Sequence, residues 1–305
     1  MTESFGARLA ARVDERQSQV VLGLDPDPAR LWPEAVEAAP ADGSPAERAA
    51  AAVAVHCSAL VAAAGPACVA VKPQLACFER LGAPGWIALA VVAAHAREAG
   101  LLVLADGKRG DIDVSASAYA QAFLTGTPTP FGDVAGLAAD ALTVNPYLGR
   151  DALEPFVAGA REVGAGLFVL VRTSNPGAAD VEDLPAPGGE TVWQRVARLV
   201  DELGAGDTGG PLSDVGAVLG ATAPGHLARA RELMPRAPFL LPGIGAQGGR
   251  VEDLAPAFAP HRAAGLVTAS RSIVRAHEQP GAPSGAAAAA RAEAQRLRDA
   301  AWALG

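Results

Sequence analysis

The charged residues of one short stretch, residues 101–112, are the first candidates for chemistry. Its sequence, LLVLADGKRGDI, begins as an apolar run and ends with Asp106, Lys108, Arg109 and Asp111. An apolar run of this length predicts a buried strand, with the charges at its carboxyl end. Asp106 and Lys108 are two residues apart, so in an extended backbone their side chains point to the same side. Because buried opposite charges are costly unless they are paired or used, this stretch is the leading candidate for an active site.

Lysine is rare in this chain. Of the 25 basic residues, only Lys72 and Lys108 are lysines, and all the others are arginines. Arginine does not release its proton near neutral pH, whereas lysine can. Lys72 also follows an apolar run, residues 67–71, and is therefore expected at the end of a second strand. Proton transfer at these two positions is one interpretation. The other is that the two lysines were retained by chance or form structural ion pairs, since structural networks also perturb charges.

The rest of the chain supplies the elements that position these residues. Apolar runs predict strands at residues 20–24, 67–71, 101–105, 141–144, 166–171, 217–219, 239–241 and 265–268. Helical spacing predicts helices at residues 5–17, 45–64, 86–98, 113–124, 152–163, 191–203, 226–233, 251–258 and 285–304. Such alternation implies a parallel sheet, and eight closed units form an α/β fold, the (β/α)8 TIM barrel. A doubly wound open sheet is the alternative. We expect one domain over residues 1–305, with an N-terminal helix and a C-terminal helix rich in alanine and arginine.

Polar residues follow the predicted strands where a barrel places its active site, at the carboxyl ends. They are Asp25, Lys72, Asp106 with Lys108, Asn145, Ser174, Thr222, and Ser270 with Arg271, and the apolar Pro242 stands at the end of the seventh strand. Asp25 lies between two prolines, so it either caps a turn or contacts a sugar hydroxyl. Ser174 begins Ser-Asn-Pro, which is either a turn or a loop that recognises a base. Asp111 either caps the next helix or joins the charge network of Lys108.

A glycine-rich segment, PGIGAQGG, follows the seventh predicted strand. It formally matches a dinucleotide-binding fingerprint, but it lies in the seventh unit and no acidic residue follows about 20 residues later at a strand end. Loops after strands seven and eight of a barrel often bind phosphate through backbone N–H groups, and Gln247 and Arg271 would add side-chain donors. Tight turns that require glycine are the other interpretation.

Composition excludes several classes of protein. A net charge of −8 argues against general nucleic-acid binding. Three cysteines without close spacing predict neither a disulfide framework nor a zinc site, and five scattered histidines predict no metal. We expect a cytoplasmic protein with reduced thiols, because no apolar export signal or clean membrane span is present. The alanine-rich residues 49–64 contain His56 and fit a buried helix better than a membrane span.

Seven motifs occur in a fixed order: LGLDPD, VKPQ, DGKRGDI, TVNPYLG, SNPG, PGIGAQGG and ASRSI. Together they resemble the orotidine 5′-phosphate decarboxylase family, and most of all its longer bacterial branch, over residues 20–275. The resemblance implies decarboxylation of orotidine 5′-phosphate to uridine 5′-phosphate, the last step of de novo UMP biosynthesis. It also implies a homodimeric barrel that uses no cofactor and no metal.

The resemblance assigns roles to individual residues. It implies that Lys108 protonates C6 as carbon dioxide leaves and that Asp106 lies beside the substrate carboxylate. Lys72 and Asp111 complete the network, and Asp111 comes from the other subunit. The substrate-binding residues that it implies are Asp25 at the ribose, Ser174 at the pyrimidine, Gln247 and Arg271 at the phosphate, and Ile112, Ser115, Pro242 and Ser270.

Three residues depart from the pattern of that family. Gly107 stands where alanine is expected, Ser115 where threonine is expected, and Ser272 where glycine is common. These departures concern packing rather than the chemistry.

Two other functions stay open. A metal-dependent sugar-phosphate aldolase or decarboxylase of the same superfamily would need magnesium and would carry a carboxylate in place of Lys72. A non-catalytic nucleotide-binding protein would bind uridine 5′-phosphate without turnover.

Overall fold

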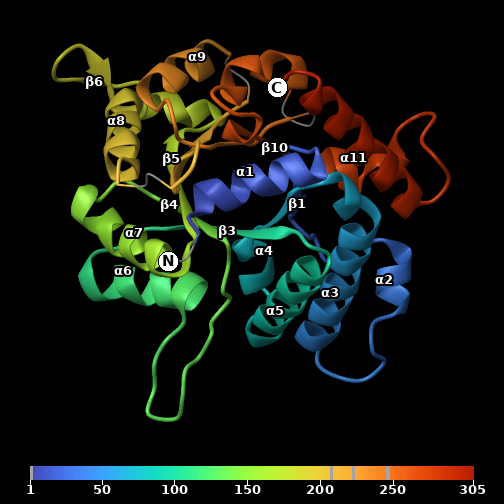
Figure 1. The fold of residues 1–305 in the computed structure, drawn as a ribbon. Coiled ribbons are helices and arrows are strands. Elements are labelled where there is room, and N and C mark those ends of the chain that lie inside the picture. Colours follow the sequence, from blue (N-terminus) through green and yellow to red (C-terminus); the bar gives the residue numbers. More distant parts are fainter. Residues whose placement is uncertain (1–2, 207–208, 222–223, 245–247) are drawn as a thin grey trace.

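A closed barrel of eight parallel strands forms the centre of the protein (Figure 1). The structure is a computed structural model, and it describes residues 3–206, 209–221, 224–244 and 248–305. The barrel strands, in their order around the barrel, are β1 (Val20–Leu24), β2 (Ala70–Pro73), β3 (Leu102–Arg109), β4 (Ala141–Val144), β5 (Gly166–Arg172), β8 (Val215–Leu219), β9 (Phe239–Leu241) and β10 (Gly265–Ala269). β10 pairs with β1 and closes the sheet. The TIM barrel prediction is therefore confirmed, and the open-sheet alternative is wrong.

Helices surround this barrel on all sides (Figure 1). The α-helices are α1 (Phe5–Arg16), α2 (Pro33–Glu37), α3 (Pro45–Ala64), α4 (Leu75–Glu79), α5 (Ala83–Glu98), α6 (Asp113–Ala120), α7 (Arg150–Val163), α8 (Val192–Gly204), α9 (Pro224–Leu233), α10 (Arg271–Val274) and α11 (Ala286–Trp302). Shorter turns are the π-helical η2 (Gln121–Thr125) and the 3-10 helices η1 (Gly65–Ala67), η3 (Pro176–Asp180), η4 (Val251–Phe258), η5 (Arg262–Ala264) and η6 (Ala276–Glu278).

Several elements differ from the sequence prediction. β3 continues four residues beyond the predicted strand, through the charged residues to Arg109. Residues 251–258 form the 3-10 helix η4 rather than an α-helix, and Pro256 inside it lacks the N–H that an α-helix would use. The short helices α2, α4 and α10, and the small antiparallel pair β6 (Pro185–Ala186) and β7 (Glu190–Thr191), were not predicted. Elements of two to five residues are too short to show a periodic pattern.

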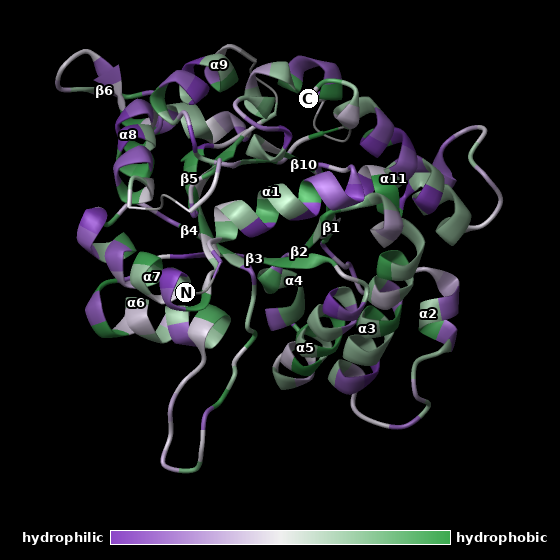
Figure 2. Ribbon diagram, in the orientation of Figure 1, coloured by the Kyte–Doolittle hydropathy of each residue, from purple (hydrophilic) through white to green (hydrophobic). Residues whose placement is uncertain are grey.

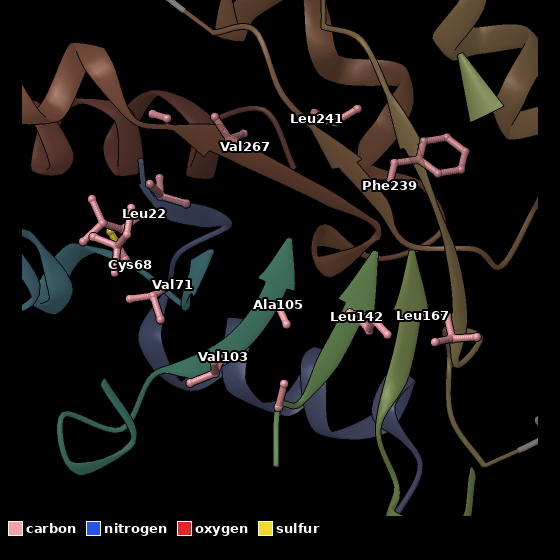
Figure 3. Close-up of a cluster of buried hydrophobic side chains, with 14 of the residues drawn as sticks. Leu22, Cys68, Val71, Val103, Ala105, Leu142, Leu167, Phe239, Leu241 and Val267 are labelled. Atoms are coloured by element: carbon pink, nitrogen blue, oxygen red, sulfur yellow. The ribbon is translucent and has the colours of Figure 1, made fainter. Parts of the chain in front are cut away.

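The apolar residues form two layers. Residues that point outward from the strands, such as Val71, Val103 and Leu142, pack against the surrounding helices (Figure 3). Colouring by hydropathy shows mostly apolar residues along barrel strands such as β2 and β5, and a mixture of apolar and hydrophilic residues along the surrounding helices (Figure 2). Inside the barrel, Phe5 and Leu9 of α1 join residues that point inward from the strands. Because α1 packs there, it covers the amino-terminal end of the barrel, and the carboxyl ends of the strands stay open for a site.

α3 is the most apolar long helix. Together with η1 it is the one helix among the described residues that is long and apolar enough to cross a membrane. However, 56% of the apolar 18-residue window in this segment is buried inside the protein. Its buried side packs in the layer between the barrel and the helices, together with α5 and α11. α3 therefore has the character of a core helix, as the sequence predicts.

Candidate active site

Lys72 and Asp106 form a buried ion pair at the carboxyl ends of the neighbouring strands β2 and β3. The Lys72 Nζ lies 2.5 Å from the Asp106 Oδ2, and each side chain is only 7% exposed. The carboxylate of Asp25, which follows β1, lies 4.0 Å from the same Nζ. Parallel pairing brings these positions together, because β2 lies between β1 and β3. The structure thus joins three of the residues that the sequence places at strand ends.

The Asp106 carboxylate accepts four hydrogen bonds. Lys72 and Gln74 donate to its Oδ2, at 2.5 and 3.2 Å. Lys108 Nζ and the hydroxyl of Thr143 donate to its Oδ1, at 2.5 and 2.9 Å. With both oxygens satisfied, this carboxylate is fixed in position and orientation.

The charges of this cluster reinforce one another. Burial acts to raise the pKa of Asp106, but attraction by Lys72 and Lys108 outweighs it and holds the pKa well below its usual value. Burial acts to lower the pKa of Lys72, but Asp106 and Asp25 outweigh it and raise the pKa. At neutral pH the buried pair is therefore ionised, and the site presents fixed charges of both signs.

Lys108 is the accessible cation of the cluster. Its side chain is 42% exposed, whereas that of Lys72 is 7% exposed. The prediction that Asp106 and Lys108 face the same side is confirmed by their contact, but the backbone of Lys108 is not extended. Its φ is 47°, which lies in the left-handed region. The strand thus bends at Lys108 and directs its ammonium group to the open end of the barrel, where a substrate can reach it.

Asp111 and Ile112 follow β3 in a short loop, and Ser115 lies in the first turn of α6. The Asp111 carboxylate accepts a hydrogen bond from the backbone N–H of Ile112, at 2.8 Å. Among the described residues of this one chain, no ion pair joins Asp111 to Lys108. Ile112 is 54% exposed, and Ser115 at the start of α6 is also exposed. Within one chain, the structure therefore does not bring these three residues into the cluster.

A second group of residues lies beside the cluster, between β1 and β10. Asp25, Ser270 and Arg271 line one small cleft, together with Arg275 and the buried His56. Ser270 packs directly against the backbone of Gly23. A side chain on residue 23 would not fit, because its Cβ atom would lie only 2.7 Å from the Cβ of Ser270. Asp25, predicted to bind the ribose, and Arg271, predicted to bind the phosphate, therefore lie in the same cleft.

His56 has a structural environment in this cleft. Its Nδ1 accepts a hydrogen bond from the backbone N–H of Trp32 at 3.2 Å, and burial lowers its pKa to about 4. It is therefore neutral at physiological pH. Within the described part of the chain, no group of three or more His, Cys, Asp or Glu residues is arranged to hold a metal ion.

Ser174 and Pro242 complete the rim on the far side. Ser174 follows β5 and packs against Gly220, which follows β8. The contact is so close that a Cβ atom on residue 220 would lie 2.8 Å from the Cβ of Ser174. Pro242 follows β9, and its carbonyl accepts a hydrogen bond from Ala221 N–H at 3.0 Å. Gln247 and Thr222 lie outside the described residues.

The Ser174 loop is held by charged residues that the sequence did not single out. Arg172 donates two hydrogen bonds to Asp183, each at 2.9 Å. The Thr173 backbone N–H and hydroxyl both donate to Glu182, also at 2.9 Å. These contacts join the end of β5 to the segment before β6.

Thr143 and Gln74 were also missed, although both contact Asp106. Thr143 lies in β4, whose bounds the sequence predicted correctly, and it is the one polar residue of that strand, ALTV. A polar residue inside a four-residue buried strand was the available signal. Gln74 follows Lys72 by two residues and so faces the same side. Gly107 is one of the three residues that depart from the family pattern. An alanine at this position would place its Cβ atom 2.8 Å from the Leu75 side chain.

Comparison with known proteins identifies similar chains. The model of the orotidine 5′-phosphate decarboxylase / HUMPS family matches residues 18–286. The orotidine 5′-phosphate decarboxylase of Deinococcus radiodurans is 44% identical over 280 residues, 90% of each chain. That of Rhodopirellula baltica is 43% identical over 284 residues, again 90% of each chain. A crystal structure of a candidate orotidine 5′-phosphate decarboxylase from Streptomyces avermitilis is 35% identical, with a TM-score of 0.79 over 100% of this chain and 97% of its own. The family match includes all eight barrel strands.

Proposed function

The chain belongs to the orotidine 5′-phosphate decarboxylase / HUMPS family, and we propose that it converts orotidine 5′-phosphate to uridine 5′-phosphate and carbon dioxide. This makes it a carboxy-lyase of pyrimidine biosynthesis. The observation that carries the proposal is the Lys72–Asp106–Lys108 cluster, with two buried charges and one accessible ammonium at the open end of the barrel.

The chemical difficulty of this reaction lies at C6 of the pyrimidine. When the bond from C6 to the carboxylate breaks, its electron pair stays on C6 as a vinyl carbanion that the ring delocalises poorly. A fixed positive charge beside that carbon stabilises the developing negative charge. The accessible ammonium of Lys108 suits this position, because Asp106 holds it at 2.5 Å.

Proton transfer completes the reaction. Lys108 gives a proton to C6, which forms the C6–H bond of uridine 5′-phosphate, and the lysine regains a proton from water. The carboxylate of Asp106 lies beside the departing carboxylate, and its ionised state at neutral pH favours departure of that group. Lys72 compensates Asp106 from the buried side, so that the charge of Asp106 is retained in the folded protein.

The remaining substrate groups match the other rim residues. We propose that Asp25 binds the ribose hydroxyls, that Ser174 binds the pyrimidine, and that Arg271 and Gln247 bind the phosphate. Ile112, Ser115, Pro242 and Ser270 are proposed as further contacts. Binding energy from the phosphate, which does not react, can then orient the ring for the reaction at C6.

Assembly and location are further proposals. We infer a homodimer in which Asp111 reaches the active site of the other subunit, since among the described residues of one chain it forms no ion pair with Lys108. A two-fold dimer is the commonest oligomer of soluble proteins. We also propose one domain over residues 1–305, no cofactor, no metal, no nucleic-acid or membrane partner, and a cytoplasmic location. Support for the last comes from the three unpaired cysteines.

The test is the loss of orotidine 5′-phosphate absorbance with and without a chelator. We expect turnover that the chelator leaves unchanged. Lys108→Arg is the matched variant: it keeps the charge but should lose nearly all turnover while still binding uridine 5′-phosphate, because arginine is a poor acid. Absence of turnover in the wild type, or turnover that needs magnesium, would contradict the proposal. Magnesium dependence would instead favour the sugar-phosphate chemistry of the same superfamily.

A further inference from the structure

The strands β3 and β4 lose their regular pairing where the catalytic lysine lies. Leu104 pairs with Ala141 and Ala105 with Leu142, but the next pair is Arg109 with Val144. Three residues of β3, numbered 106–108, therefore lie opposite one residue of β4, Thr143. Such a bulge redirects the side chains of the longer strand, and bulges are frequent beside active sites.

The hydroxyl of Thr143 makes two hydrogen bonds to residues of this bulge. Its side chain is buried, with the residue only 1% exposed. The backbone N–H of Lys108 donates to the Thr143 Oγ1 at 2.9 Å. The same hydroxyl donates its proton to the Asp106 Oδ1, also at 2.9 Å. One hydroxyl thus acts as acceptor for the backbone of one charged residue and as donor to the side chain of the other.

The backbone of Lys108 needs such support. Its φ of 47° is in the left-handed region, which residues other than glycine rarely adopt. A conformation of this kind persists only when surrounding contacts hold it. The hydrogen bond from the Lys108 N–H to Thr143 is a contact of this type, and the bond from Lys108 Nζ to Asp106 is a second.

We infer that Thr143 is a positioning residue for the decarboxylation, and that its hydroxyl holds Lys108 and Asp106 in their reactive arrangement. This inference rests on the proposed function. Thr143 does not have to touch the substrate: it fixes the backbone from which the ammonium of Lys108 extends, and it fixes the oxygen of Asp106 that the ammonium contacts. A displacement of about 1 Å in a catalytic group can lower a rate about a hundredfold.

Two substitutions separate the hydroxyl from the shape of the side chain. Thr143→Val keeps the branched shape and removes the hydroxyl, whereas Thr143→Ser keeps the hydroxyl and removes the methyl group. Thr268→Val is the matched control, because Thr268 is a buried threonine of β10 whose Oγ1 has no hydrogen-bond partner among the described residues. For each protein, kcat and KM with orotidine 5′-phosphate and the Kd of uridine 5′-phosphate are measured.

We expect Thr143→Val to lower kcat by at least about tenfold, while the Kd of uridine 5′-phosphate stays within about twofold of the wild type. Thr143→Ser should keep kcat within about threefold, since the hydroxyl is present, and Thr268→Val should match the wild type. A loss of packing alone would not lower kcat while leaving the Kd of uridine 5′-phosphate unchanged, and serine, which lacks the methyl group, would not restore kcat.

Other results would overturn the inference. A kcat of Thr143→Val within about threefold of the wild type would show that the hydroxyl has no positioning role. Equal losses in the valine and serine variants would assign the effect to packing. If circular dichroism shows that the valine variant is unfolded, Thr143→Ala is compared with Thr143→Ser by the same criteria. A wild type and a Thr268→Val variant that both fail to turn over the substrate would refute the proposed function itself.

Discussion

Replacing Lys72 with methionine tests how strongly the fold depends on the buried charges of the site. Lys72 and Asp106 are each 7% exposed, and their charged atoms are 2.5 Å apart. Methionine occupies a space similar to the lysine side chain but carries no charge. The Asp106 carboxylate would then keep its hydrogen bonds from Gln74, Lys108 and Thr143 but would lose its buried cation.

The expected loss of stability follows from this geometry. Removing one partner of a buried ion pair typically destabilises a protein by about 3–5 kcal/mol, because the other charge stays buried without compensation. Here the positive charge of Lys108 still attracts the Asp106 carboxylate, although solvent weakens this attraction because the Lys108 side chain is 42% exposed. We therefore expect Lys72→Met to lower the free energy of unfolding by about 3 kcal/mol at pH 7, the low end of that range. Adding Asp106→Asn to Lys72→Met removes the buried negative charge that has lost its partner. The double variant should therefore regain about 1 kcal/mol or more of the free energy of unfolding.

The assay is urea-induced unfolding of the wild type, the single variants Lys72→Met and Asp106→Asn, and the double variant, all at one protein concentration. Arg12→Met is the control, because Arg12 pairs with Glu15 at the surface and such pairs contribute at most about 1 kcal/mol. The reasoning is refuted if Lys72→Met costs no more than Arg12→Met. It is also refuted if the double variant loses the sum of the two single losses, since that would mean that the two charges do not interact.

Three further outcomes are expected. Arg271→Ala should lower kcat/KM for orotidine 5′-phosphate but not for its phosphate-free nucleoside, and equal losses for both would argue against a phosphate contact. Mixing Lys108→Ala subunits with Asp111→Ala subunits should restore about half of the wild-type activity per dimer, because one of the two shared sites then carries neither substitution; no recovery after confirmed subunit exchange would place Asp111 in its own chain. His56, whose folded pKa is lowered to about 4, binds its proton more readily in the unfolded chain. The stability that its neutral form provides is therefore present above about pH 6.5 and declines as the pH falls towards 4, and unfolding at pH 7 and pH 5 should show a smaller decline in His56→Gln.

Much of the architecture could be predicted because it follows from local patterns. The strand at residues 141–144 and the strand at residues 239–241 were predicted with their observed bounds. Apolar runs indicate strands wherever both faces are buried, as they are in a closed barrel. Once the strands are parallel, all their carboxyl ends meet at one end, so the positions of Asp25, Lys72 and Asp106 at one site also follow from the sequence.

The phosphate end was predicted only in part. Arg271 and Ser270 do line the cleft beside Asp25. Gln247 lies outside the described residues, so its role stays a prediction. The roles of Ile112, Ser115 and Asp111 also stay predictions, because one chain does not bring them to the cluster and the sequence of one chain does not define the surface of a second.

The sequence by itself determined the barrel, the two lysines and the strand ends that carry the charges. Only the tertiary structure decided that β3 bulges after Ala105, that Lys108 adopts a left-handed backbone, and that Thr143 and Gln74 hold Asp106. The physical reason is the range of the interactions. Apolar periodicity reports burial over a few neighbouring residues, whereas the contacts of Asp106 with Gln74 and Thr143 span 32 and 37 residues of sequence. Such contacts depend on the register between strands, and register is set when the whole barrel closes.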